Sequence, residues 1–235
     1  MQEFMQLIEN RHSARDLFDP ERAIPAEDME KILEAARWTP TAHNMQNFEI
    51  VVVDDNQLLA AISEIKVPPN LTFIKENYPQ LSFTEDELRR KKTGIMGTMF
   101  PKSWQTPDPS LEDIENEDRG AYMAKQIVSC SAILFVLYDP SRRAPASEGD
   151  FLGIISLGCA MENMWLMANS LGIGVHIVSS LAVKKVAAEI AKLLNVPDKF
   201  RLAFSMRLGY PVTPVHYLRV RRDRDDFVHH NGFRK

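Results

Sequence analysis

The feature that most restricts the fold is a long apolar run, FLGIISLGCAMENMWLMANSL, at residues 151–171. At helical spacing its large apolar side chains occupy most of the circumference, so this helix must be covered on most sides. Glu162, Asn163 and Asn169 interrupt the run, and a buried helix explains it better than a membrane span. Its large apolar residues are Leu152, Ile155, Leu157, Met161, Met164, Trp165 and Met167.

Other elements follow from periodicity and from the residues that break it. Four segments rich in β-branched residues predict strands: FEIVVVDD, SAILFVLYD, GIGVHIVSS and FRLAFSMRLGYP. Apolar residues at helical spacing predict helices within residues 2–10, 24–40, 58–65, 121–129 and 183–197. After Pro214 we expect a last strand and then an arm.

The stretch from about 67 to 119 has a different character. It mixes prolines, both charge signs and scattered aromatic residues, a composition typical of loops and short helices inserted over a site. No linker rich in Gly, Ser or Pro divides the chain. We therefore expect one domain, residues 1–235, with an insertion at about 67–119 that could act as a lid.

Composition excludes several function classes. The formal net charge of −4 gives no global affinity for nucleic acid, so any anion site must be local. Two cysteines, Cys130 and Cys159, are too few for a disulfide framework or a thiolate metal site, and we expect reduced thiols in a cytoplasm. The start, MQEFMQLIEN, has neither the basic residues nor the apolar run of a signal peptide.

Common catalytic signatures are absent from the sequence. It has no GxGxxG after a strand, no GxxxxGK[ST], no HExxH and no GxSxG. The histidines are scattered, so we expect no metal site.

The first candidate site is the basic cluster Arg11, His12, Ser13 and Arg15. In an extended segment the side chains of Arg11, Ser13 and Arg15 share one side and His12 points to the other. Guanidinium groups and a hydroxyl suit a phosphate monoester. A solvated charge cluster after a helix is the alternative.

The second candidate is RVRRDR at residues 219–224, in which Arg219 and Arg221 would share a face and complete an anion site. A nucleic-acid patch is a weaker alternative because Asp223, Asp225 and Asp226 offset its charge, and a solvated tail is a further one.

Two loops provide further candidates. Thr41, His43, Asn44 and Gln46 form an amide-rich loop that could pair with a heterocyclic or polyhydroxylated ligand, or could simply be a turn. In GIGVHIVSS, main-chain N–H groups from residues 178 to 180 could face a ligand.

Taken in chain order, four segments resemble the nitroreductase family of flavin mononucleotide (FMN) enzymes. Residues 11–53 are similar to that family's basic segment, helix, polar loop and first strand. GCAMENMWLMANSLGIGVHIVSSL is similar to its central helix and the bend that follows. MRLGYP and LRVRRD are similar to its penultimate strand and its C-terminal basic pair.

This resemblance implies an α+β fold with a central, mostly antiparallel sheet flanked by helices, a long buried central helix and a C-terminal arm. It also implies a homodimer with FMN sites at the subunit interface. From the net charge and the interrupted apolar run we expect no nucleic-acid or membrane partner. The reaction implied is a ping-pong cycle in which NAD(P)H reduces the flavin and a nitroaromatic, a quinone or a similar small acceptor reoxidises it. Reductive dehalogenation on the same fold, or flavin binding without turnover, are the alternatives.

The resemblance assigns roles to residues of the basic cluster. Arg11 and Ser13 would bind the phosphate and the ribityl chain, and Arg15 would reach the pyrimidine edge of the flavin. His12 occupies a variable basic position. Arg219, or Arg221 in a shifted register, would join Arg11 at the phosphate.

The same resemblance assigns roles to the loops. Pro40, Thr41, Ala42 and Asn44 would come from the other subunit, and Gln46 of the same loop is a further cofactor contact. Main chain at Ile177, Val178, Ser179 and Ser180 would lie by the central ring, although relatives often carry a glycine where this chain has serines. Asn70 is a further candidate for a ribityl or ring contact.

Overall fold

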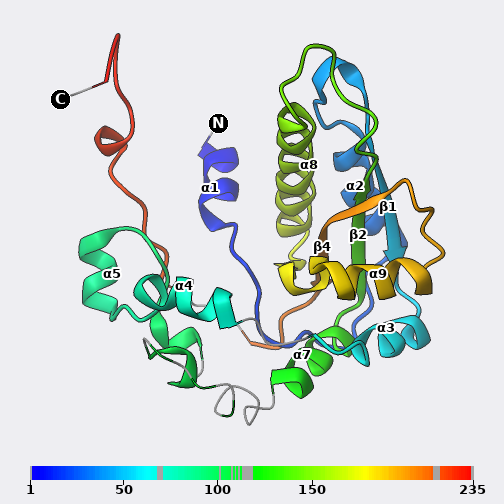
Figure 1. The fold of residues 1–235 in the computed structure, drawn as a ribbon, viewed down its shortest axis with the longest axis horizontal. Helices are drawn as coiled ribbons and strands as arrows, with labels where there is room; N and C mark the ends of the chain where they lie inside the picture. The colour runs from blue at the N-terminus through cyan, green and yellow to red at the C-terminus, as the bar shows by residue number, and fades with distance from the viewer. Residues whose placement is uncertain are drawn as a thin grey trace. The chain divides into compact units, whose positions relative to one another are not determined.

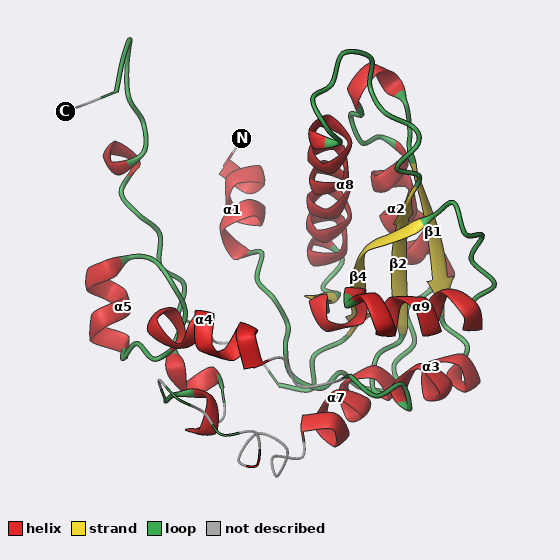
Figure 2. Cartoon of the chain, in the orientation of Figure 1, coloured by secondary structure: helices red, strands yellow, loops and turns green. Residues whose placement is uncertain are grey.

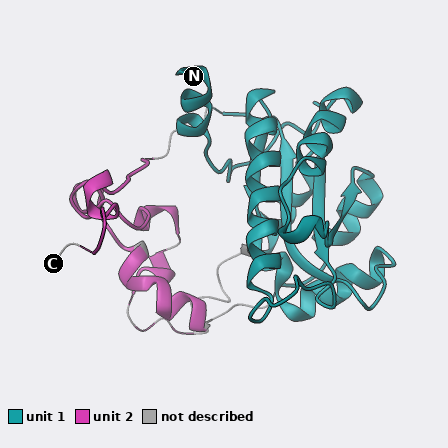
Figure 3. Ribbon diagram, turned by 90° about the horizontal axis from the view of Figure 1, so that it is seen from above, with its two compact units in different colours: residues 1–67, 120–215 teal, residues 68–119, 216–235 magenta. Residues whose placement is uncertain are grey.

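The computed structural model describes residues 2–67, 71–100, 102–106, 108, 110, 112, 119–213 and 218–233. The chain forms two compact units (Figure 3): residues 1–67 with 120–215, and residues 68–119 with 216–235. The first segment of the second unit coincides with the predicted insertion. The single domain expected from the sequence stays a prediction.

The first unit is built on a four-stranded sheet with the order β1-β2-β4-β3 (Figure 2). Its strands are β1 (Phe48–Val53), β2 (Ala132–Tyr138), β3 (Gly174–Ile177) and β4 (Arg201–Gly209). All neighbouring strands are antiparallel, and the expected strand segments and α+β class are confirmed. β2 is an inner strand and is buried over nearly its whole length. Its side chains alternate between the two faces of the sheet, and each face is covered by a core.

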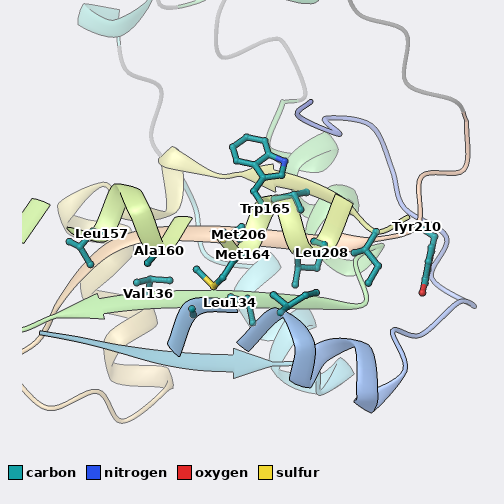
Figure 4. Close-up of a cluster of buried hydrophobic side chains, with 14 residues drawn as sticks. Leu134, Val136, Leu157, Ala160, Met164, Trp165, Met206, Leu208 and Tyr210 are labelled. Atoms are coloured by element: carbon teal, nitrogen blue, oxygen red, sulfur yellow. The ribbon is translucent and has the colours of Figure 1, made fainter. Parts of the chain in front are cut away.

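Helices cover both faces of this sheet (Figure 1). On one face, α2 (Ala26–Arg37) and α8 (Phe151–Ser170) pack on β2 and β4 (Figure 4). The core there includes Leu134, Val136, Met206 and Leu208 from the strands and Leu157, Met164 and Trp165 from α8.

The opposite face of the sheet carries a second core. Its helices are α3 (Asn56–Ser63), α7 (Arg119–Val128) and α9 (Lys184–Leu193). Ile62, Ile127 and Ile190 from these helices pack with Ile133 and Phe135 of β2. The short N-terminal helix α1 (Gln2–Asn10) buries none of its residues in this chain.

The apolar helix α8 is covered on one side only within this chain. Seven of its residues are buried, among them Gly153, Ala160 and Ala168. Phe151 and Ile154 are 67% and 57% exposed. Among the described residues, α8 is the one helix long and apolar enough to span a bilayer. In this structure its buried side packs in the hydrophobic core on the sheet.

The second unit contains α4 (Leu71–Leu81) and α5 (Glu85–Lys91) with the short 3-10 turns η2 (Gly97–Met99), η3 (Lys102–Trp104) and η5 (Arg224–Asp226). Thr84 caps α5 in a capping box with Glu87. Lys92 and Asp223 form an ion pair between the two chain segments of this unit. Residues 218–233 contain no strand, and residues 214–217 of the expected last strand lie outside the described residues.

Candidate functional site

The basic cluster lies in an extended segment beside β3. Ser13 pairs with Val175 in a parallel bridge, and the Ala14 N–H donates to the Val175 carbonyl at 2.8 Å. At its far end the segment meets β4, where the Asp19 N–H donates to the Tyr210 carbonyl at 2.8 Å. Because the pairing with β3 is parallel, the residues after Ser13 advance in the same direction as those after Val175.

Side chains of α7, α8 and β4, and of the turn that follows α7, hold the main chain of this segment. The bonds come from residues more than a hundred positions away, so the segment is fixed by the core rather than by its own sequence. The bonds run from Trp165 Nε1 of α8 to the His12 carbonyl (3.2 Å), from Gln126 of α7 to the Arg15 carbonyl, from Arg207 of β4 to the Asp16 carbonyl (2.8 Å), and from the Phe18 N–H to Ser129 Oγ (3.3 Å).

Arg11 lies against α8. Its Nε is 3.2 Å from Glu162 Oε1, and its guanidinium carbon is 4.6 Å from the ring centroid of Trp165. Both charged side chains are partly exposed, at 23% for Arg11 and 41% for Glu162, so solvent screens the pair. His12 is turned to its own backbone, with Nδ1 2.8 Å from the Asn10 carbonyl.

The bend after β3 leaves two main-chain donors. The Val178 N–H donates to the Ser205 carbonyl at 3.0 Å, so this group faces a neighbouring strand rather than a ligand. Ser179 and Ser180 begin the 3-10 turn η4 (Ser179–Ala182), and within the described residues their N–H groups find no acceptor. Donors at the start of a helical turn suit a carbonyl or an anion.

The amide-rich loop has an unusual backbone. His43, Asn44 and Gln46 have φ values of 51°, 53° and 45°, a left-handed conformation that costs non-glycine residues energy. The Ala42 N–H donates to Ser156 Oγ of α8 at 3.2 Å, and the Gln46 N–H donates to Thr41 Oγ1 at 3.1 Å. Pro40, Asn44 and Gln46 are exposed. Backbone strain of this kind clusters at ligand-binding sites.

The C-terminal arginines belong to the second unit. Arg221 Nη1 donates to the Val220 carbonyl at 2.7 Å, and Arg219 also takes part in an interaction. Arg11 belongs to the first unit, and its pairing with Arg219 or Arg221 stays a prediction. Asn70 lies outside the described residues.

The sequence interpretation missed two polar residues next to the basic segment, one fully buried and one partly buried. Arg207 of β4 is fully buried, and it pairs in register with His176 of β3. Burial, and then the charges of Arg207 and Arg15, lower the pKa of His176 to about 3, so this imidazole is neutral at physiological pH. An arginine at an inward position of the apolar segment FRLAFSMRLGYP was the available signal.

The donors of the basic segment fit a phosphorylated flavin. Arg11, Ser13 and Arg15 lie along one segment, and the Ser179 and Ser180 N–H groups follow β3, with which that segment makes an isolated bridge at Ser13. These groups are hydrogen-bond donors, as phosphate and ring carbonyl oxygens require. No group of three or more metal-ligating side chains occurs among the described residues.

Among known proteins, the chain is similar to a protein of Archaeoglobus fulgidus named for an NADH dehydrogenase/NAD(P)H nitroreductase activity. The two are 42% identical over 211 residues, which cover 90% of this chain and 87% of the relative. The NADPH-dependent oxidoreductase of Staphylococcus haemolyticus is 22% identical over 205 residues. That match covers 87% of this chain, which spans only 63% of the relative's length.

Solved structures share the fold. Nitroreductase A from Vibrio parahaemolyticus superposes with a TM-score of 0.63 at 19% identity, over 100% of this chain and 78% of the other. A nitroreductase with bound FMN from Bacteroides fragilis gives a TM-score of 0.58 at 19% identity, over 94% and 96% of the two chains. The sequence profile described as Nitroreductase family matches residues 8–210. That match spans most of the chain and includes the basic segment, α8 and β3. The chain therefore belongs to the nitroreductase family.

Proposed function

We propose that this chain is an FMN-dependent oxidoreductase that takes hydride from NAD(P)H and reduces a nitroaromatic, a quinone or a similar small acceptor in a ping-pong cycle. The observation that carries the proposal is the basic segment held in parallel beside β3, through the Ser13–Val175 bridge and the Ala14 N–H bond, because it brings the segment at residues 11–15 next to the strand that leads to Ser179 and Ser180. Names of relatives that include NAD(P)H nitroreductase and NADPH-dependent oxidoreductase support it.

Bound FMN would supply the redox chemistry, while the protein supplies orientation and charge. Arg11 and Ser13 would bind the phosphate and ribityl chain, and to do so Arg11 exchanges Glu162 for the phosphate. Arg15 places a fixed cation at the pyrimidine edge, where negative charge develops on reduction. The N–H groups of Ser179 and Ser180 would donate toward the central ring. FMN-bound structures within the same fold support this choice of cofactor.

The homodimer is the second part of the proposal. On α8, Phe151, Ile154 and Ile155 are 67%, 57% and 46% exposed, and Trp38, which follows α2, is 72% exposed. Large apolar side chains exposed on one helix indicate an interface. The loop at residues 41–46 is bonded to α8 through Ser156, a buried residue of that helix, and in the dimer it would complete the partner's FMN site.

A hollow of about 740 Å³ between α1, α2 and α8 extends the same face. Its lining includes Phe4, Leu7, Trp38 and Leu166, and none of the predicted cofactor residues. We therefore assign it to the dimer interface rather than to the FMN site.

The remaining parts of the proposal concern the organisation and setting of the chain. Residues 1–235 would act as one FMN-binding domain, with the insertion at about 67–119 controlling access of the acceptor. Cys130 and Cys159 are free thiols, in keeping with a reducing cytoplasm.

The visible spectrum of the purified protein tests the function. We expect a yellow protein, or uptake of added FMN, with bleaching by NADH or NADPH without oxygen and return of colour on adding a nitroaromatic or a quinone. A protein that stays colourless with added FMN contradicts every flavin function. Bound FMN that neither nicotinamide bleaches indicates flavin binding without turnover, and return of colour with halogenated aromatics alone indicates the dehalogenase-like alternative.

A further inference from the structure

Arg207 is a fully buried cation with few partners. Its Nη2 donates to the Asp16 carbonyl at 2.8 Å, and its guanidinium carbon lies 4.6 Å from the ring centroid of Phe18. Within the described residues Nε and Nη1 have no acceptor. The one N–H group of Nε and the two of Nη1 are therefore unsatisfied at a fully buried position.

Such a group destabilises the fold, because burying a charge without a paired carboxylate loses hydration that a single carbonyl does not replace. Burial lowers the pKa of Arg207 to about 10, which leaves it charged at neutral pH. The groups that act on it are Asp16 of the basic segment, Tyr122 of α7, Cys130 and His176. Burial raises the pKa of the Cys130 thiol to about 12, so neither Cys130 nor His176 neutralises the guanidinium charge.

The position of this charge relates it to the proposed flavin site. Arg207 bonds to the residue that follows Arg15, and it pairs in register with His176, which precedes the bend at 177–180. The charges of Arg207 and Arg15 both act on His176. The guanidinium therefore lies in the layer directly beneath the two segments that would contact the flavin.

We propose that Arg207 is a positioning residue whose buried charge stabilises the reduced flavin relative to the oxidised one. This inference rests on the proposed FMN site. When NAD(P)H transfers hydride, one proton and two electrons pass to the flavin, NAD(P)⁺ leaves, and the protein then holds one more negative charge. A fixed cation in a low-dielectric layer favours that state, and it raises the reduction potential without touching the substrate.

The test separates charge from structure by measuring FMN dissociation constants for both oxidation states. In Arg207→Met we expect the ratio of the reduced to the oxidised constant to rise about tenfold, which for a two-electron couple is a fall of about 30 mV in midpoint potential. Ser129→Ala is the matched control, since it removes the hydrogen bond to the Phe18 N–H and no charge. It should weaken both oxidation states alike and leave the potential unchanged.

Arg207→Lys provides a second measurement should Arg207→Met fail to fold. A buried ammonium loses its proton more readily than a guanidinium, so its potential should match the wild type at pH 6 and fall below it as the pH rises. The role of the charge is overturned if Arg207→Met leaves the midpoint potential unchanged. It is also overturned if the potential of Arg207→Lys lies below that of the wild type by the same amount at every pH. A protein that binds no FMN in the wild type refutes the proposed function instead.

Discussion

At the scale of single residues, Arg11 has two competing partners. The structure places it on Glu162 and over Trp165, and the proposed function requires it to bind the FMN phosphate. A guanidinium on a phosphate makes charge-assisted hydrogen bonds, which are stronger than its screened pair with Glu162. This competition gives two opposite expectations for substitutions at the two residues.

Arg11→Ala should weaken FMN binding by roughly 10- to 100-fold, because a charge-assisted contact contributes about 1.5 to 3 kcal/mol. Titration of the apoprotein with FMN, followed by flavin fluorescence, measures the dissociation constant. Lys185→Ala, which removes one exposed cation from α9, is the control of equal charge and should bind normally. An unchanged affinity in Arg11→Ala would remove Arg11 from the phosphate site.

Glu162→Gln should tighten FMN binding by a few fold. The change releases Arg11 and removes a negative charge near the phosphate, and partly exposed pairs of this kind contribute about 0.2 to 1 kcal/mol. The same fluorescence titration applies, and the gain should shrink at high salt as screening increases. Weaker binding would mean that Glu162 positions Arg11 rather than competing for it.

His176 should make the fold sensitive to acid. Its folded pKa of about 3 lies below its ordinary value of 6.5, so as the pH falls below 6.5 the unfolded chain binds the proton first. The free energy of unfolding then falls by up to about 1.4 kcal/mol per pH unit until about pH 3, or roughly 2 kcal/mol by pH 5. Urea unfolding of the apoprotein at pH 7.5 and 5 measures this loss. His176→Gln should lose less over that interval, and an equal loss would place the acid sensitivity elsewhere.

At the scale of elements, the loop at residues 41–46 stores backbone strain beside α8. Three of its residues have a left-handed backbone, and bonds to Ser156 and Thr41 hold it there. A loop fixed in this way can present Asn44 and its neighbours to a ligand without ordering first. Its sequence has the polar residues of a turn, and tertiary bonds determine its conformation.

His43 reports on this strain because its side chain is exposed and its φ is 51°. His43→Val should lower the free energy of unfolding by about 1 kcal/mol or more, since β-branched residues rarely adopt this conformation. His43→Asn should leave stability nearly unchanged, since asparagine tolerates it. Urea unfolding of the three proteins measures the difference. Equal stabilities would show that the loop relaxes to another conformation.

At the scale of the whole molecule, the single chain leaves half of α8 uncovered. The side that faces the sheet is well packed, while Phe151, Ile154 and Ile155 are exposed on the other side. A second copy of the chain would bury this surface, and it would also bring the partner's loop to the FMN site.

Ile154→Lys should therefore yield a monomer by light scattering, with lower FMN affinity because the partner's loop is lost. Isoleucine at this position contacts solvent in the single chain, so the subunit itself should stay folded by circular dichroism. Val212→Lys, at an exposed apolar residue outside α8, is the matched control and should remain a dimer. A dimer that survives Ile154→Lys would place the interface elsewhere.

By itself the sequence determined the strand segments, the helices of the first unit and the order of the candidate site segments. These features follow from local periodicity and from residues that break it, so they can be predicted without coordinates. It did not indicate that Arg11 pairs with Glu162, that Val178 bonds to Ser205, or that Arg207 and His176 lie beneath the basic segment. Those contacts join residues far apart in the chain, and only the packing of α8, β3 and β4 with one another and with the segment at residues 11–18 decides them.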